Sequence, residues 1–135
     1  MNRMKVAACL LVMVMVLAAC QESKRDRFAR EAREYTEKNC PHAEFGDVIF
    51  LDSLTCPNDG SNTLTYHYSI HGDSTDIAAV VNNYNDLFSA LLGAVRNSVD
   101  LRHVKAEGLN ITYTYYNSET GEEITSFCFK PEDYN

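Results

Sequence analysis

The sequence has little positive charge. Its 135 residues include 12 Lys and Arg against 19 Asp and Glu, which gives a formal net charge of −7 at pH 7. The first 19 residues hold two of the basic residues and none of the acidic ones, so the 116 residues that follow carry a net charge of −9. Nucleic-acid binding depends on Lys and Arg side chains that neutralise phosphates. The shortage of such residues therefore argues against a nucleic acid as partner.

The sequence also lacks the motifs of several enzyme classes. It contains no G-x-G-x-x-G or Walker-type loop, which leaves nucleotide chemistry without support. It has no glycine-framed serine turn of the kind that hydrolases use, and its cysteine spacing fits no zinc signature. His67 and His71 would lie roughly 13 Å apart on one strand, too far to share a metal ion. We therefore expect no catalytic residue, no metal ion and no cofactor.

The longest apolar run is too short to cross a membrane. A cationic stretch over residues 1–5 precedes about 14 apolar residues, which would span roughly 21 Å as a helix. The hydrocarbon core of a bilayer is about 30 Å thick. This composition predicts a signal peptide over residues 1–19.

The end of this segment, Leu17-Ala18-Ala19-Cys20, resembles the lipobox of bacterial lipoproteins. In that class the cysteine thiol receives a diacylglycerol, the peptide is cut just before it, and the new amino terminus is acylated. The resemblance implies lipidation at Cys20 and anchoring to the membrane by lipid alone. Gln21 stands at the position where lipoproteins that stay at the inner membrane carry Asp. The resemblance therefore implies that the protein is transferred to the outer membrane. An ordinary secretory signal that ends near Ala18 is the alternative.

Three cysteines remain after the signal peptide and Cys20: Cys40, Cys56 and Cys128. Three is an odd number, so at most one intramolecular disulfide can form. A strand of about eight residues would hold Cys40 roughly 26 Å from Cys56, beyond the reach of a disulfide. Cys56 lies just after the first predicted strand, and Cys128 lies near the end of the fourth. Both strand ends are expected to approach the same edge of the sheet. We therefore predict that Cys56 and Cys128 are bridged or close, and that Cys40 is unpaired.

Residues 20–39 differ in composition from the rest of the chain. They contain dense charges of both signs, with Phe28, Ala32 and Tyr35 spaced as a narrow apolar stripe on a helix. This pattern predicts a lipid-anchored cysteine followed by a charged helical stalk. The helix could be a solvated spacer that packs partly on the domain, or it could bind a partner. Residues 40–135 hold most of the negative charge and are predicted to form an acidic domain.

Hydrophobic periodicity predicts an α+β domain. Alternating residues predict strands over 47–54, 63–71, 109–116 and 123–130, and a period of 3.6 predicts one long helix over 74–99, capped by Asp73 or Ser74. The element order is α-β-β-α-β-β. We expect a two-layer sandwich, in which one long helix packs on one face of a four-stranded, mainly antiparallel sheet.

Several short segments resemble those of a group of small uncharacterised bacterial envelope proteins. They are Cys40-Pro41, Leu51–Thr55, Leu64–Tyr68, Gly108 before Ile111–Tyr115, Gly121 and Lys130–Tyr134. The resemblance covers roughly residues 40–134. It implies no known activity and no catalytic or binding residues.

Strand alternation also predicts a polar face on the sheet, opposite the face that packs on the helix. The candidate binding residues on it are His67, His71, Thr112, Thr114 and Tyr116. We predict a non-enzymatic binding module of the cell envelope, whose ligand is a protein, a glycan or another envelope component. Two alternatives stay open. One is an inhibitor or immunity protein, because a small acidic fold suits a basic enzyme, and the other is a small hydrolase that uses His67 or His71.

Overall fold

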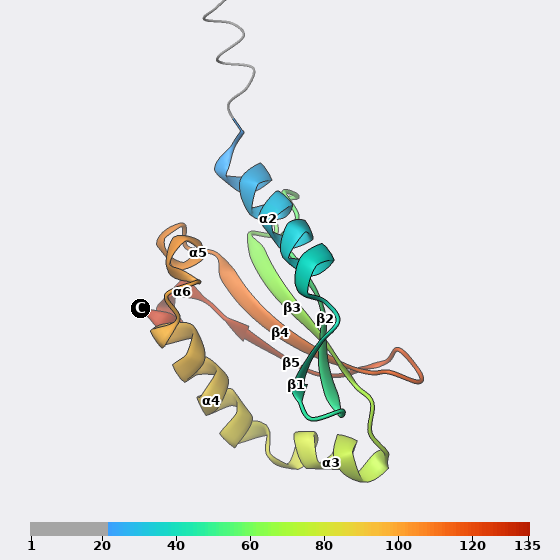
Figure 1. Ribbon diagram of the computed structural model, residues 1–135. Coiled ribbons are helices and arrows are strands. Elements are labelled where there is room, and N and C mark those ends of the chain that lie inside the picture. Colours follow the sequence, from blue (N-terminus) through green and yellow to red (C-terminus); the bar gives the residue numbers. More distant parts are fainter. Residues whose placement is uncertain (1–21) are drawn as a thin grey trace, which may run out of the picture.

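A five-stranded mixed sheet organises the structure, which is a computed structural model that describes residues 22–135 (Figure 1). The strands lie in the spatial order β1 (His42–Phe45), β2 (Ile49–Thr55), β3 (Thr63–Ile70), β4 (Asn110–Asn117) and β5 (Glu123–Phe129). The helices are α2 (Lys24–Asn39), α3 (Ser74–Asn82), α4 (Tyr84–Asn97), α5 (Arg102–Ala106) and α6 (Pro131–Tyr134). The predicted signal peptide and Cys20 lie outside the described residues.

The α+β class is as predicted, but the sheet differs from the predicted one in strand number and direction. The first two predicted strands, β2 and β3, form an antiparallel pair as expected. β1 was missed because all four of its residues are exposed, so no apolar alternation marks it. β3 and β4 pair in parallel, since the helices between them return the chain to the end of the sheet where β3 began. The prediction of four mainly antiparallel strands was therefore wrong.

The helical segment after β3 is also divided. The structure confirms Asp73 as the cap, because its carboxylate accepts hydrogen bonds from the N–H groups of Thr75 and Asp76. The single long helix was wrong, since α3 ends at Asn82 and α4 starts at Tyr84. Between them, the Asn83 side chain donates to the carbonyl oxygen of Ala79 at 2.7 Å. A side chain that bonds to the backbone in this way competes with helix continuation.

The helix α2 is part of the domain rather than a stalk outside it. Phe28 and Ala32, spaced i and i+4, are buried in the main hydrophobic core. The Thr36 hydroxyl accepts a hydrogen bond from the backbone N–H of Leu54 in β2 at 2.9 Å. The boundary predicted at residue 40 therefore does not separate two structural units.

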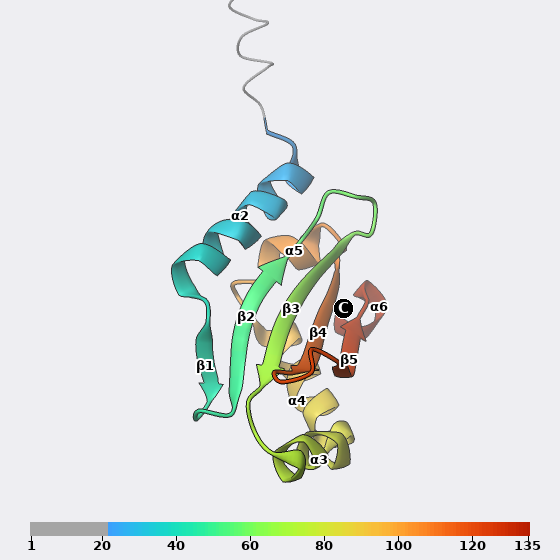
Figure 2. The ribbon, with the colours of Figure 1, turned by 90° about the vertical axis from the view of Figure 1, so that its right-hand side faces the viewer.

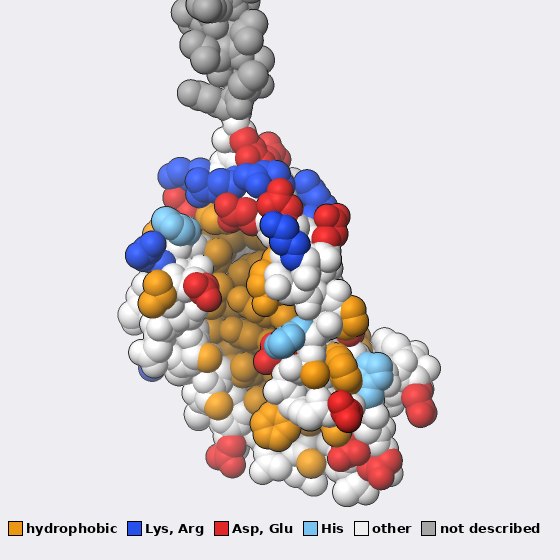
Figure 3. All heavy atoms as spheres, viewed as in Figure 1, with side chains coloured by type: hydrophobic (Ala, Val, Ile, Leu, Met, Phe, Trp, Pro, Cys, Tyr) orange, Lys and Arg blue, Asp and Glu red, His pale blue; other side chains and the backbone are white. Residues whose placement is uncertain are grey.

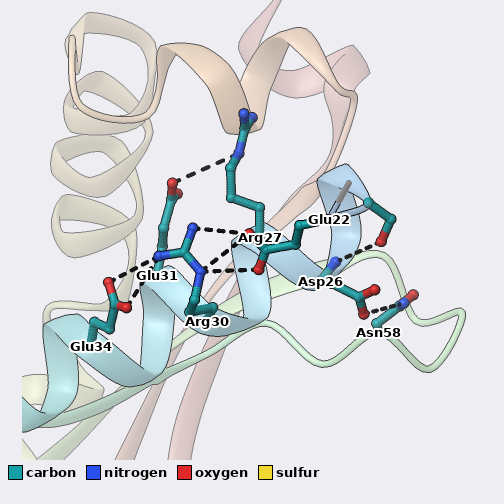
Figure 4. A network of polar contacts seen from close by, with 8 residues as sticks. Glu22, Asp26, Arg27, Arg30, Glu31, Glu34 and Asn58 are labelled. Carbon is teal, nitrogen blue, oxygen red and sulfur yellow. Dashed lines mark hydrogen bonds and ion pairs between the residues drawn. The ribbon is translucent and has the colours of Figure 1, made fainter. Parts of the chain in front are cut away.

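Polar contacts hold the first half of α2 in place (Figure 4). The Asp26 carboxylate accepts a hydrogen bond from the Asn58 side chain in the β2–β3 loop, at 2.9 Å. Lys24 pairs with Glu107, directly after α5, at 2.7 Å. Arg30 lies between Glu22 and Glu34, with which it pairs on the outer side of the helix. Such exposed pairs each contribute little to stability, but the first two connect α2 to distant parts of the chain.

The cysteines do not form the predicted bridge. Cys40, Cys56 and Cys128 are all free thiols in the structure. Cys128 and the end of β2 lie at the same level, but β3 and β4 stand between β2 and β5. Three strand spacings amount to roughly 14 Å, twice what a disulfide tolerates. The prediction failed because the sequence did not reveal the strand order.

Candidate functional site: a groove floored by tyrosines

Helices cover the two margins of one face of the sheet and leave a groove along the middle of that face. On one side α2 packs against β2, as Figure 2 shows, and Figure 1 shows this helix apart from α4 and α5. On the other side Phe88 of α4 packs against Phe129 of β5, with ring centroids 5.2 Å apart. β3 and β4 lie between these two contacts. Figure 3 shows the result, a hollow lined by hydrophobic side chains.

Four tyrosines form the floor of this groove, which we call the tyrosine groove. Tyr66 and Tyr68 come from β3, and Tyr113 and Tyr115 come from β4. Because β3 and β4 pair in parallel with Tyr66 opposite Tyr113 and Tyr68 opposite Tyr115, the rings stack across the strands at centroid distances of 4.8 and 4.9 Å. The four hydroxyls make no hydrogen bond to any residue from 22 to 135. None of their oxygen atoms is fully buried, so all four can reach solvent. The phenols therefore present free polar groups to the groove.

One end of the groove is a hollow of about 460 Å³. Its walls are mostly apolar, and they come from α2, the end of β2, the start of β3 and α5. The apolar wall residues include Phe28, Ala32, Leu54, Leu64, Leu101 and Val104. Tyr66 connects this hollow to the floor.

The other end is a second hollow of about 370 Å³. It lies between β1, the start of β2, α3 and the first turn of α4, and Tyr115 connects it to the floor. The apolar wall residues are Phe45, Val48, Ile49, Val80 and Leu87, together with Ala79. Phe45 is 76% exposed, which is high for a large apolar side chain. Concave apolar sites with a few polar groups are typical of ligand-binding pockets.

The charges at the groove are negative. Glu31 and Asp100 line the first hollow and Asp76 lines the second, and neither lining contains a Lys or an Arg. Glu44 of β1 also acts on the floor, because its charge adds to the burial that raises the pKa of Tyr66 and of Tyr115. The site is therefore apolar with an acidic rim.

The floor phenols resist ionisation. Burial raises the pKa of Tyr66 and of Tyr115 to about 12, and it raises the pKa values of Tyr68 and Tyr113 well above the usual range. These groups hold their protons more tightly in the folded chain than in the unfolded chain, where the value is about 10. Their contribution to stability is complete below pH 10 and is lost as the pH rises through the raised values.

We therefore expect a spectrophotometric titration at 295 nm to show a late-ionising fraction among the eight tyrosines. The floor phenols should ionise only near pH 12 or on alkaline unfolding, whereas in urea all eight should titrate near pH 10. The same eight groups serve as their own control. A native titration that matches the one in urea would contradict the burial of the floor.

The predicted binding residues share the opposite face of the sheet. His67 Nε2 lies 2.7 Å from the Thr55 hydroxyl, and its ring stacks on Tyr116 at 6.0 Å. Burial lowers the pKa of His67. Thr114 is buried and bonds with Ser126 at 3.0 Å. Most of these side chains have polar partners within the face, and the five predicted residues, including His71 and Thr112, line neither hollow of the tyrosine groove.

The two histidines of the hydrolase alternative also lie on this face, where Ser69 is the serine nearest to His71 by sequence. The Ser69 hydroxyl is 2.8 Å from His71 Nε2. Ser69 is only 5% exposed, and no carboxylate among residues 22–135 forms a hydrogen bond or an ion pair with the His71 ring. A serine nucleophile needs access to its substrate and a base that a third group orients. The pair lacks both.

Sequence reasoning missed the groove. It predicted a face of the sheet that packs on a helix, opposite the polar face, but expected one helix to cover that face. The available signal was the residue type: phenols recur at alternate positions in both strands, where a closed core favours aliphatic side chains without polar atoms.

The fold and the groove define the class of protein: a small α+β domain with a mixed sheet and an apolar groove between its helices. Residues 23–125 match the family described as Domain of unknown function (DUF8479). The chain belongs to this family. The match begins at the residue that caps α2, which agrees with the structural role of that helix.

A crystal structure from Pseudomonas aeruginosa, described as that of a "putative secreted protein", has a similar fold. The TM-score is 0.66 at 18% sequence identity, over 85% of this chain and 100% of that one. At this identity the similarity concerns the fold alone. No curated protein matches the chain in sequence. Within residues 22–135, every helix falls short of the length and apolarity needed to cross a bilayer.

Proposed function

We propose that the protein is a lipid-anchored component of the bacterial cell envelope, at the outer membrane to judge by Gln21, and that it acts as a non-enzymatic binding module through the tyrosine groove. The observation that carries the second part is the groove itself, in which two apolar hollows flank a row of phenols without hydrogen-bond partners. The anchor rests on the lipobox resemblance at Cys20. The solved structure with a similar fold, described as secreted, supports a location outside the cytoplasm.

An inhibitor or immunity protein is the second candidate. The observation in its favour is the acidic rim, where Asp100 and Glu44 have no ion-pair partner among residues 22–135. A basic enzyme would find a complementary surface there. The groove is the more specific feature, because a negative surface alone does not require a hollow.

A photoreactive benzoylphenylalanine placed at single positions of the full chain in cells would test the proposal. Position 45 lies at the groove, position 71 lies on the polar face, and position 99 is a matched control, since Val99 is 72% exposed and lines no described hollow. We expect a defined adduct at position 45, above the background at position 99. Mass spectrometry of the same membrane-extracted protein should show acylation of Cys20.

Adducts at position 71 alone would move the binding site to the polar face. Equal labelling at all three positions would contradict a specific binding module. A soluble chain that starts at a residue other than Cys20 would contradict the lipid anchor. The adducts would still test the groove independently.

A further inference from the structure

We infer that the ligand of the tyrosine groove is an extended, apolar polypeptide segment that carries a Lys or an Arg. This inference rests on the proposed binding function and specifies the chemistry of the ligand. It follows from the shape of the groove, from its charge and from the free phenols of its floor.

The shape fits one extended chain. The floor follows β3 from Leu64 to Ile70, a rise of roughly 20 Å at ~3.3 Å per residue. An extended segment of about six residues has the same length. The hollows at the two ends would each accept apolar side chains of that segment. Only β3 and β4 separate the strand under α2 from the strand under α4, and so narrow a floor suits one extended chain better than a helix with its side chains.

The charge selects a cation. Asp100 and Glu44 have no ion-pair or hydrogen-bond partner among residues 22–135, whereas two nearby lysines are engaged. Lys24 pairs with Glu107, and the Lys105 ammonium donates to carbonyl oxygens at the end of α4. A Lys or an Arg in the groove would meet free carboxylates and tyrosine rings, and both attract cations. A fatty acid or an anionic phospholipid would bring its negative charge to the same rim and be repelled.

The floor distinguishes a polypeptide from a hydrocarbon chain. The hydroxyls of Tyr66, Tyr68, Tyr113 and Tyr115 make no hydrogen bond to residues 22–135, and like any phenol they are protonated at neutral pH. A peptide backbone offers carbonyl and N–H groups that can pair with such hydroxyls. A hydrocarbon chain would cover the hydroxyls without pairing them, at the cost of desolvation.

The test uses the full, acylated chain in phosphatidylcholine nanodiscs. Because the chain contains no tryptophan, the fluorescence of a tryptophan-bearing peptide reports binding without a protein background. The probe is the capped peptide Leu-Lys-Trp-Lys-Leu-Leu. The control peptide replaces both lysines by glutamate, and empty nanodiscs correct for lipid binding. We expect saturable binding of the lysine peptide and at least tenfold weaker binding of the glutamate peptide at low salt.

Paired variants localise the binding. Glu44→Gln with Asp100→Asn should weaken it by about tenfold at low salt. Glu119→Gln with Glu122→Gln, two exposed residues of the β4–β5 turn, changes the net charge equally and should leave the affinity unchanged. Ala79→Phe, which fills the second hollow, should weaken binding by at least tenfold. Ala90→Phe, on the exposed side of α4, is its matched control.

The outcomes separate the two proposals. If both peptides bound equally well and Ala79→Phe weakened their binding, the ligand would not need a cation, but the groove would remain the binding site. Binding of an anionic fatty acid in preference to the lysine peptide would replace the polypeptide with a lipid. Binding that none of the groove variants changes would overturn the groove as the site, and with it the proposed function.

Discussion

Replacing Phe129 by alanine should destabilise the domain by about 3–5 kcal/mol, the range for a buried phenylalanine that leaves a cavity. The Phe129 side chain is fully buried. It lies between Phe88 of α4 and Tyr113 of the groove floor, at centroid distances of 5.2 and 6.1 Å. The substitution therefore removes the contact that positions α4 against the sheet and leaves one floor ring without support.

Urea unfolding followed by circular dichroism would measure this effect. Cys128→Ala is the matched control, because Cys128 is the neighbouring residue on the exposed face of β5. We expect its free energy of unfolding to stay within about 0.5 kcal/mol of the parent chain. Small domains have only about 5–15 kcal/mol of stability in total, so Phe129→Ala could leave a measurable unfolded fraction without denaturant. A loss below 1 kcal/mol would contradict the packing of α4 on β5.

Phe28→Ala should have a comparable effect, a loss of about 3–5 kcal/mol. Phe28 is 4% exposed and lies in the main core although it belongs to the charged segment before residue 40. It also lines the first hollow. The same substitution should therefore weaken ligand binding in the groove, which connects the helix nearest the proposed anchor with the proposed function.

The control for α2 is Arg33→Ala, because Arg33 is exposed on the same helix. We expect a change within about 0.5 kcal/mol for this variant. The same urea titration distinguishes a structural helix from a stalk. If Phe28→Ala and Arg33→Ala gave equal stabilities, α2 would be a spacer outside the cooperative domain and would not form a wall of the first hollow.

Local sequence patterns predicted the elements that have one apolar face and one polar face, or a capping residue at one end. The alternation in Thr63–Ile70 marks β3 because one face of that strand is apolar and the other is polar. Asp73 marks the start of α3 because a capping carboxylate satisfies N–H groups that the helix leaves unpaired. β1 carries no such signal, since both of its faces are exposed. The division at Asn83 was also missed, because one asparagine hardly alters the apolar period around it.

The sequence by itself determined the acidic composition, the α+β class, the polar and apolar faces of β3 and β4, and the prediction of a signal peptide with a lipobox-like end. These properties depend on residue type and local spacing alone. Only the tertiary structure decided the parallel pairing of β3 with β4, the separation of Cys56 from Cys128, the docking of α2 and the groove between α2 and α4. These features depend on which distant segments meet. A periodic pattern shows that a side chain will be on an apolar face, but not whether another element covers that face or leaves it open to a ligand.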